Sequence, residues 1–293
     1  FFFKQKTAYE IKECDWSSDV CSSDLRVYPQ PRVLKIIQDK GLQKEFYRLH
    51  GIPTAEFRLV SHKDDIAQHG HLFPVMQKLR TSGYDGKGVT ALNDFNDLSM
   101  AFDEPSVIER KVDLATEISV IVSRNASGVI RHFPPVEMEF NAEANLVEFL
   151  FSPATIDDAL ASQAIAIATR IIGELDMVGL LAVELFVSKS GEILVNEIAP
   201  RPHNSGHQTI EGNVTSQYEQ HLRAILDLPP GDTSIVQPAV MVNLLGAKGH
   251  TGPAHYEGLQ EVLRMPGVHV HLYGKKTTKP FRKMGRSEEH TSE

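Results

Sequence analysis

Apolar side chains recur at helical spacing in four parts of the chain and predict four helices. The first helix breaks near Asp39, which suits the N-cap of the second, and the second carries Leu42, Phe46 and Leu49 on one apolar face. Gly51 then ends the second helix. The helices are expected over residues 31–39, 39–51, 156–175 and 216–226.

Short runs rich in β-branched and aromatic residues predict strands between these helices. The chain shows no internal repeat, and its mixture of strands and helices predicts an α+β fold. The strands are expected at residues 56–60, 75–79, 107–111, 118–122, 129–133, 180–187, 193–198, 239–245 and 268–273.

Residues 181–198 contain two strand patterns joined by a short Ser/Gly turn, which predicts a β-hairpin. If Ser190 and Gly191 form a two-residue turn, Glu184 lies directly across from Glu197 and the two carboxylates share a face. A three-residue turn would break this register. The other face would then be apolar, with Val183, Leu185, Val187, Leu194 and Ile198.

Two like charges placed opposite each other in a sheet repel, so this pair calls for a compensating ion. Carboxylate oxygens, with phosphate oxygens completing an octahedron, are the usual ligands of Mg²⁺ on a nucleotide. Asn196 is a further oxygen donor, although strand alternation points it mainly toward the other face. Taken alone, a solvent-facing hairpin with two unrelated glutamates explains the pattern about equally well.

A glycine-punctuated loop follows the strand that carries Lys78. Gly83, Gly86 and Gly88 let backbone N–H groups converge on an anion, and Lys78 and Lys87 add positive charge. The spacing matches neither the P-loop nor the dinucleotide fingerprint. The loop therefore indicates a hairpin that folds over a nucleotide, or only a turn.

Glu109 lies in a strand pattern at residues 107–112, and Glu117 follows it. A strand edge followed by an acid could contact the edge of an adenine and the hydroxyls of its ribose. Solvated strand charges are the commoner explanation for each glutamate taken separately.

Charge and the two chain ends narrow the possible partners. The formal net charge of −8 gives no general attraction for nucleic acid, and no stretch approaches the ~18 apolar residues of a membrane helix. Residues 1–25 and 286–293 resemble translated sequencing adapters, so we expect both segments to lie outside the fold. Cys14 and Cys21 both fall in the first segment, and a chain without other cysteines suits a cytoplasmic location.

Taken in chain order, these motifs resemble the ATP-grasp ligases, and within them the 5-(carboxyamino)imidazole ribonucleotide synthase family. The resemblance runs from about residue 26 to residue 285. It rests on Lys78, the loop from Gly83 to Gly88, Glu109, Glu117, Glu184, Asn196, Glu197 and residues 199–207, and it continues through 211–229 and 241–246.

The resemblance implies an ATP-grasp fold and a homodimer. A lid subdomain would span 53–112 and a larger antiparallel-sheet domain 113–285. Residues 26–52 would be a helical remnant or linker, because the family's N-terminal Rossmann-like domain is missing.

The resemblance also implies an activity with small-molecule partners only. ATP and bicarbonate would give carboxyphosphate, which carboxylates the exocyclic amine of aminoimidazole ribonucleotide, with Mg²⁺ held by Glu184 and Glu197. ATP would contact Lys78, Gly83, Tyr84, Asp85, Gly86, Lys87, Gly88, Glu109, Val112, Glu117, Asn196 and Glu197. The catalytic residues would be Asp85, Arg201 and His203. The ribonucleotide would contact Tyr84, Asp85, Arg201, His203, Asn204, Lys275 and Arg282, the last two as a clamp on its 5′-phosphate.

Three positions depart from the family pattern. Phe140 stands where many relatives have a His that meets ATP, Phe281 replaces a Gly, and Lys87 stands where Arg is common. Two alternatives therefore stay open: another ATP-grasp ligase or carboxylase, and a nucleotide-binding module without turnover.

Overall fold

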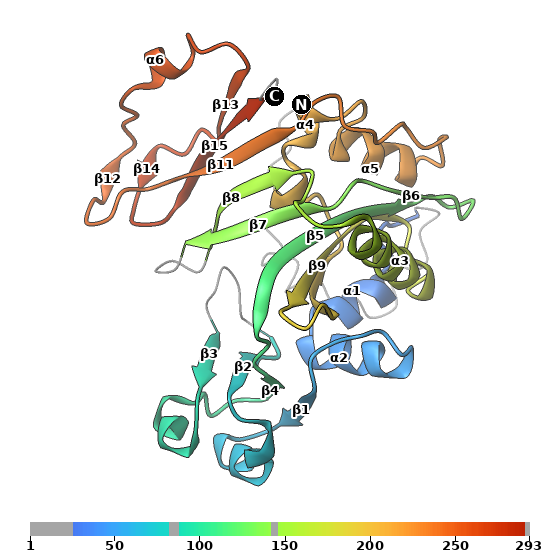
Figure 1. The fold of residues 1–293 in the computed structure, drawn as a ribbon, viewed down its shortest axis with the longest axis vertical. Coiled ribbons are helices and arrows are strands. Elements are labelled where there is room, and N and C mark those ends of the chain that lie inside the picture. The colour runs from blue at the N-terminus through green and yellow to red at the C-terminus, as the bar shows by residue number, and fades with distance from the viewer. Residues whose placement is uncertain (1–25, 82–87, 142–145, 291–293) are drawn as a thin grey trace.

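The computed structural model describes residues 26–81, 88–141 and 146–290, and these residues form two main sheet units and a small two-stranded sheet, residues 252–253 with 277–278 (Figure 1). A small sheet lies at one end of the long axis, and the C-terminal strands of a large sheet lie at the other. Two helices near the N-terminus, α1 (Pro31–Ile37) and α2 (Lys40–Leu49), lie beside the junction of the two units.

The small sheet consists of β1 (Phe57–Val60), β4 (Ser106–Arg110), β2 (Val75–Leu79) and β3 (Val89–Leu92), antiparallel in that order. Two 3-10 helices, η3 (Lys63–Leu72) and η4 (Phe95–Met100), pack against it. All of these elements lie within 53–112, the range expected for a lid. The assignment of this unit as a lid stays a prediction.

The large sheet is antiparallel throughout its main path. In spatial order it contains β10 (Ile193–Ala199), β9 (Gly179–Ser188), β5 (Leu114–Arg124), β7 (Val136–Asn141), β8 (Leu146–Ser152), β11 (Ala239–Leu245), β15 (Lys283–His290) and β13 (Val268–Leu272), and β6 (Ile130–His132) pairs with β5. The remaining elements are η5 (Asn204–Gly206), α4 (Thr209–Gly212), α5 (Gln217–Ile225), β12 (Gly252–Pro253), α6 (Leu259–Val262) and β14 (Thr277–Thr278).

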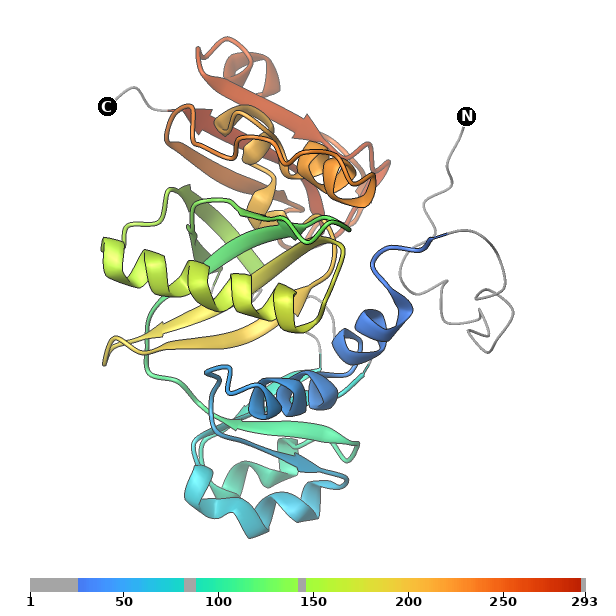
Figure 2. The same cartoon turned by 90° about the vertical axis from the view of Figure 1, so that its right-hand side faces the viewer.

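The long predicted helix is confirmed as α3 (Asp158–Glu174), which lies across one face of the large sheet (Figure 2). The Asp157 side chain caps it by accepting a hydrogen bond from the Leu160 amide at 2.8 Å. Its apolar stripe joins residues of β5, β9 and β10 in the main core. Because that face of the hairpin is covered, the opposite face is left to carry charge.

Helix α2 begins as predicted but buries a different face. The Asp39 carboxylate accepts from the amides of Gly41 at 2.7 Å and Leu42 at 3.2 Å, which confirms the N-cap. Of the expected apolar face only Phe46 is buried, whereas Leu42 and Leu49 are exposed and the buried face includes Gln43 and Lys44. These polar side chains turn inward because each finds a partner: Gln43 donates to the Ile37 carbonyl and accepts from the Tyr47 hydroxyl, and Lys44 pairs with Glu109 of the small sheet.

Residues 26–52 are more than a linker, because α1 and α2 contribute to the main core. Val33 and Tyr47 are fully buried there beside residues of α3 and the large sheet. The buried apolar side chains of α1 and α2 therefore belong to the same hydrophobic core as the β9–β10 hairpin.

The expectation that residues 286–293 lie outside the fold is wrong for residues 286–290. They belong to β15, which pairs with β11 and β13. Arg286 and Glu288 are buried there and lie 2.5 Å apart, Arg286 Nη1 to Glu288 Oε2. Burial raises the pKa of Glu288 to about 8, which the Arg286 charge only partly opposes. Residues 1–25 and 291–293 lie outside the described residues.

Phe281 adopts a backbone conformation that favours glycine, with φ at +59°. Its amide donates to the Gly246 carbonyl at 2.9 Å, so the surrounding turn fixes this conformation. We expect Phe281→Gly to raise the free energy of unfolding by about 1 kcal/mol. Urea denaturation measures the change. Phe281→Ala is the control, since it removes the ring but keeps the strained Cβ; an equal gain in both variants would contradict the backbone explanation.

Candidate functional site

The acidic hairpin has the predicted cross-strand pair: Glu184 on β9 lies directly opposite Glu197 on β10. The register arises differently from the prediction. Near the turn, Val195 pairs with Leu185, one residue out of the predicted register, because the turn is longer than two residues. A β-bulge between Val195 and Glu197 then restores the Glu184–Glu197 pair.

The bulge also decides where Asn196 points. Its Oδ1 accepts from Lys78 Nζ at 2.8 Å, and its Nδ2 lies 3.5 Å from Glu184 Oε2. The expectation that Asn196 faces away from the carboxylates is therefore wrong. Leu194 was also expected on the apolar face, but Val195 is buried in the core and Leu194 is only half-buried.

A buried cluster of charges lies where the small sheet meets α2. Lys44 Nζ lies 2.5 Å from Glu109 Oε2, and Lys78 forms an ion pair with the other carboxylate oxygen. The side chains of Lys44 and Glu109 are only 4% and 3% exposed. Burial acts to raise the pKa of Glu109, but the two lysines outweigh it and hold that pKa at about 2.

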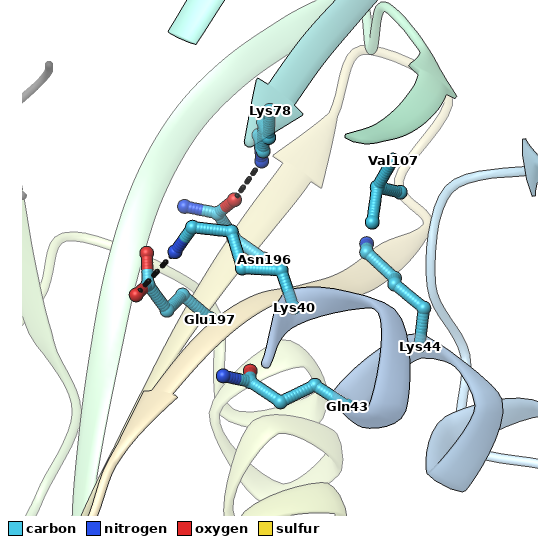
Figure 3. A pocket seen from close by; sticks show the side chains of 7 residues that line it. All are labelled: Lys40, Gln43, Lys44, Lys78, Val107, Asn196 and Glu197. Carbon is cyan, nitrogen blue, oxygen red and sulfur yellow. Dashed lines mark hydrogen bonds and ion pairs between the residues drawn. The ribbon is translucent and has the colours of Figure 1, made fainter. Parts of the chain in front are cut away.

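Lys40 completes a row of three lysines beside the hairpin, of which Lys40 and Lys78 reach hairpin side chains while Lys44 points toward Val107 (Figure 3). Its Nζ donates to Glu197 Oε1 at 2.7 Å, so α2 contacts one of the predicted metal ligands. The pocket at this point is lined by Lys40, Gln43, Lys44, Lys78, Val107, Asn196 and Glu197.

Sequence reasoning missed Lys40 and Lys44. The available signal was their spacing, because lysines four residues apart share a helix face.

A second, mainly apolar cavity of about 390 Å³ lies beside β11, β13 and β15 and contains none of the predicted site residues.

Glu117 on β5 faces the same side of the sheet as Glu184, because Glu117 pairs with Phe186 and Ser119 pairs with Glu184. Burial raises the pKa of Glu117 to about 7, against the opposing charge of Lys78. Burial, together with the charges of Glu197 and Glu117, likewise raises the pKa of Glu184 to about 7. Around Glu117 and Glu184, the nearby lysine charges therefore do not offset burial and the repulsion between the carboxylates.

That deficit of positive charge fits a divalent cation. Two carboxylates on paired strands supply hard oxygen ligands of the kind that Mg²⁺ accepts when phosphate oxygens complete its shell. The Asn196 amide lies beside them, with its nitrogen toward Glu184 and its oxygen bound by Lys78. Within the described residues, no cluster of three or more His, Cys, Asp or Glu side chains could hold a metal ion by itself. The donors therefore suit a cation that arrives with a ligand.

The segment after β10 brings His203 to Glu184, with Nε2 3.4 Å from Oε1. Burial, assisted by the Arg201 charge, lowers the pKa of His203 to about 3, so its ring is neutral at pH 7. Arg201 itself is exposed and donates to the Pro202 carbonyl at 3.0 Å. Asn204 Nδ2 is buried without a hydrogen-bond partner, which leaves a donor available to a ligand.

Some predicted residues lie elsewhere or cannot be placed. Gly83, Tyr84, Asp85, Gly86 and Lys87 lie outside the described residues, while Gly88 has a φ of +76° at the start of β3.

The predicted phosphate clamp is engaged in its own segment. Lys275 Nζ donates to the Lys283 carbonyl at 2.5 Å, and Arg282 Nη1 donates to the Thr277 carbonyl at 2.8 Å.

Val112 lies half-buried between β4 and β5. Phe140 packs against the apolar cluster of β7, β8 and β11, so hydrophobic contact occupies the place expected for a polar ATP ligand.

Family models match two parts of the chain. An ATP-grasp domain covers residues 45–218, and a phosphoribosylaminoimidazole carboxylase C-terminal domain covers residues 239–286. The N5-carboxyaminoimidazole ribonucleotide synthase of Synechococcus elongatus is 37% identical, over 89% of this chain and 67% of its own. The chain spans only 28% of the bifunctional purine synthesis protein purC/E of Dictyostelium discoideum and 50% of the phosphoribosylaminoimidazole carboxylase of Ogataea methanolica.

Solved structures give the same result. The N5-carboxyaminoimidazole ribonucleotide synthetase of Thermotoga maritima is 43% identical with a TM-score of 0.82, and the match covers 92% of this chain and 70% of that one. The N5-carboxyaminoimidazole synthase of Aspergillus clavatus, in complex with ADP and 5-aminoimidazole ribonucleotide, is 32% identical with a TM-score of 0.85, over 94% and 74% of the two chains. In the part of the chain that the structure describes, no helix is long and apolar enough to cross a membrane.

The low pKa of Glu109 predicts how its removal affects stability. The ordinary pKa of 4.5 falls to about 2 on folding, so the stabilisation is complete above pH 4.5 and is lost as the pH falls toward 2. We expect Glu109→Gln to lower the free energy of unfolding at pH 7 by about 3 kcal/mol, because it leaves two lysines near the junction without their shared carboxylate.

Urea denaturation at pH 7 and pH 3 checks this, and the deficit should be smaller at pH 3. Glu104→Gln, at an exposed position, is the matched control and should change little at either pH. A deficit of equal size at both pH values would mean that the Glu109 charge is not the cause.

Proposed function

Because the chain belongs to the N5-carboxyaminoimidazole ribonucleotide synthase family of ATP-grasp enzymes, we propose that it carries out the ATP- and bicarbonate-dependent carboxylation of aminoimidazole ribonucleotide in purine biosynthesis. One observation carries the proposal: at the Glu184–Glu197 pair, Lys40 of α2 binds Glu197, and Lys78 of the small sheet binds the adjacent Asn196. Acids for a metal on one side and cations for phosphates on the other are the components of phosphoryl transfer.

ATP would bind between the two sheet units. Lys78 and Lys40 supply positive charge to the phosphates, together with the backbone of Gly88 and the predicted residues 83–87. The Glu109 carboxylate is occupied by Lys44 and Lys78, so Glu109 would meet adenine only through its main chain, as would Val112. Glu117 would accept hydrogen bonds from the ribose.

Glu184 and Glu197 would hold Mg²⁺, with Asn196 beside them; its amide oxygen would have to leave Lys78 to join the ion or the ATP phosphates. The ion, when bound, neutralises charge on the phosphates and on bicarbonate. The chain's own contribution is to keep both carboxylates on one face of a rigid hairpin whose other face is buried in the core. Positioning of this kind accounts for most of the catalysis of phosphoryl transfer.

The acceptor would bind beyond the hairpin. Arg201 would attract bicarbonate, Asn204 would donate a hydrogen bond from its unpartnered Nδ2, and the neutral ring of His203 would line the same pocket. Asp85 would accept the proton of the reacting amine, beside Tyr84. Lys275 and Arg282 would turn from their present backbone partners to the 5′-phosphate. A homodimer and a cytoplasmic location complete the proposal and rest on family resemblance.

Phosphate release from ATP and bicarbonate, with and without aminoimidazole ribonucleotide, tests the activity. We expect the ribonucleotide to stimulate release and to be carboxylated. Release that responds only to a different acceptor would indicate another ATP-grasp ligase. ATP binding without release under any condition would indicate a nucleotide-binding module and would contradict turnover by this chain.

Glu197→Gln tests the metal assignment, because it removes one charge and keeps the side-chain shape. We expect Mg²⁺-dependent phosphate release to fall at least about 100-fold while the protein stays folded, since a metal contributes several kcal/mol to such reactions. Glu192→Gln, on the exposed turn of the same hairpin, is the control and should retain activity. Unchanged turnover in Glu197→Gln would refute the assignment.

A further inference from the structure

Gln217, the first residue of α5, is fully buried and binds the segment that carries His203. Its Oε1 accepts from the His203 amide at 2.9 Å, and its Nε2 donates to the His203 carbonyl at 2.8 Å. The same Nε2 lies 3.0 Å from His207 Nδ1. One side-chain amide therefore satisfies both backbone groups of His203, as a neighbouring strand would.

The resulting pose fixes the tautomer of His203. His203 Nδ1 lies 2.9 Å from the Ser205 hydroxyl and 3.3 Å from the Ser205 amide. The hydroxyl could donate or accept, but the amide can only donate, so Nδ1 is an acceptor. A neutral ring then carries its proton on Nε2, the atom that faces Glu184 Oε1 at 3.4 Å. Ser205 is held in turn, because its hydroxyl lies 2.7 Å from that of Ser119 on β5.

The segment packs closely against its neighbours at Gly206. A Cβ added at Gly206 would lie 2.1 Å from Ile121 Cδ1 and 2.7 Å from Gln217 Oε1. Gln217 is anchored as well. Its backbone amide donates to Thr209 Oγ1 at 2.8 Å, and that hydroxyl donates to the Gly206 carbonyl at 2.6 Å. The segment is thus clamped between β5 and the start of α5.

The carboxylate of Glu184 needs such support, because it lies opposite Glu197 and on the same side of the sheet as Glu117, and like charges so placed repel. Neutral N–H groups approach each of its oxygens: His203 Nε2 at Oε1 and Asn196 Nδ2 at Oε2. We propose that Gln217 is a positioning residue that acts through His203 to orient the Glu184 carboxylate for the metal–nucleotide complex. The inference rests on the proposed function only in taking Glu184 as a metal ligand.

The matched pair Gln217→Leu and Gln220→Leu tests this. Gln220 is equally buried on α5, but its amide binds Ser123 Oγ and the Gly231 amide, each at 2.9 Å, away from His203. Both variants should lose stability in urea denaturation. Only Gln217→Leu should weaken Mg²⁺-dependent ADP binding, by about 10-fold or more in calorimetry, as expected when a residue behind a metal ligand is lost.

A second readout does not depend on metal or activity. Imidazole ¹⁵N shifts should show His203 as the single Nε2–H tautomer in the unaltered chain and in Gln220→Leu, and a mixture in Gln217→Leu. If Gln217→Leu does not fold, Gln217→Glu serves instead, because it keeps the shape and the acceptor but loses the Nε2 donor.

The outcomes separate the two proposals. Equal ADP affinity in the Gln217 and Gln220 variants, or an unchanged His203 tautomer when Gln217 is replaced, would overturn the positioning role. If the unaltered chain bound no ADP with Mg²⁺, the proposed function would fail. The ¹⁵N spectra alone would still decide whether Gln217 determines the tautomer of the His203 imidazole.

Discussion

The site depends on holding two like charges together, Glu184 and Glu197 on paired strands. The repulsion is tolerated because the other face of the hairpin is packed into the main core and because cations approach from outside the hairpin. Lys40 comes from α2 and Lys78 from the small sheet. The same charges that would bind a nucleotide therefore also join the two sheet units.

Helix α2 links those units through its N-terminus. Asp39 caps the helix and pairs with Arg80, whose Nη2 lies 2.6 Å from Asp39 Oδ2, while the Lys40 amide donates to the Arg80 carbonyl at 2.9 Å. Further along, Lys44 shares Glu109 with Lys78. A cap, a backbone hydrogen bond and a buried ion pair thus fix the row of lysines relative to the acids.

The sequence predicted the elements whose patterns are local. The N-cap at Asp39 and the long helix α3 follow from local spacing and are confirmed. The pairing of Glu184 with Glu197 is also confirmed, although it arises from a longer turn and a β-bulge that the local pattern did not predict. Strands β7 and β8 were not predicted, although Val136 to Asn141 alternates apolar and polar residues. The inward lysine Lys44 and the burial of β15 depend on partners far along the chain, which no local pattern reveals.

The bulge at Asn196 shows why register alone does not define such a site. In a regular strand, consecutive residues face opposite sides, so Asn196 would enter the apolar core and leave an unpaired amide, at a cost of about 1–3 kcal/mol. The bulge instead places Asn196 beside Glu197 on one face, where its oxygen meets Lys78 and its nitrogen meets Glu184. The irregularity brings an amide and two carboxylates together, a donor set that two regular strands would not provide from adjacent positions.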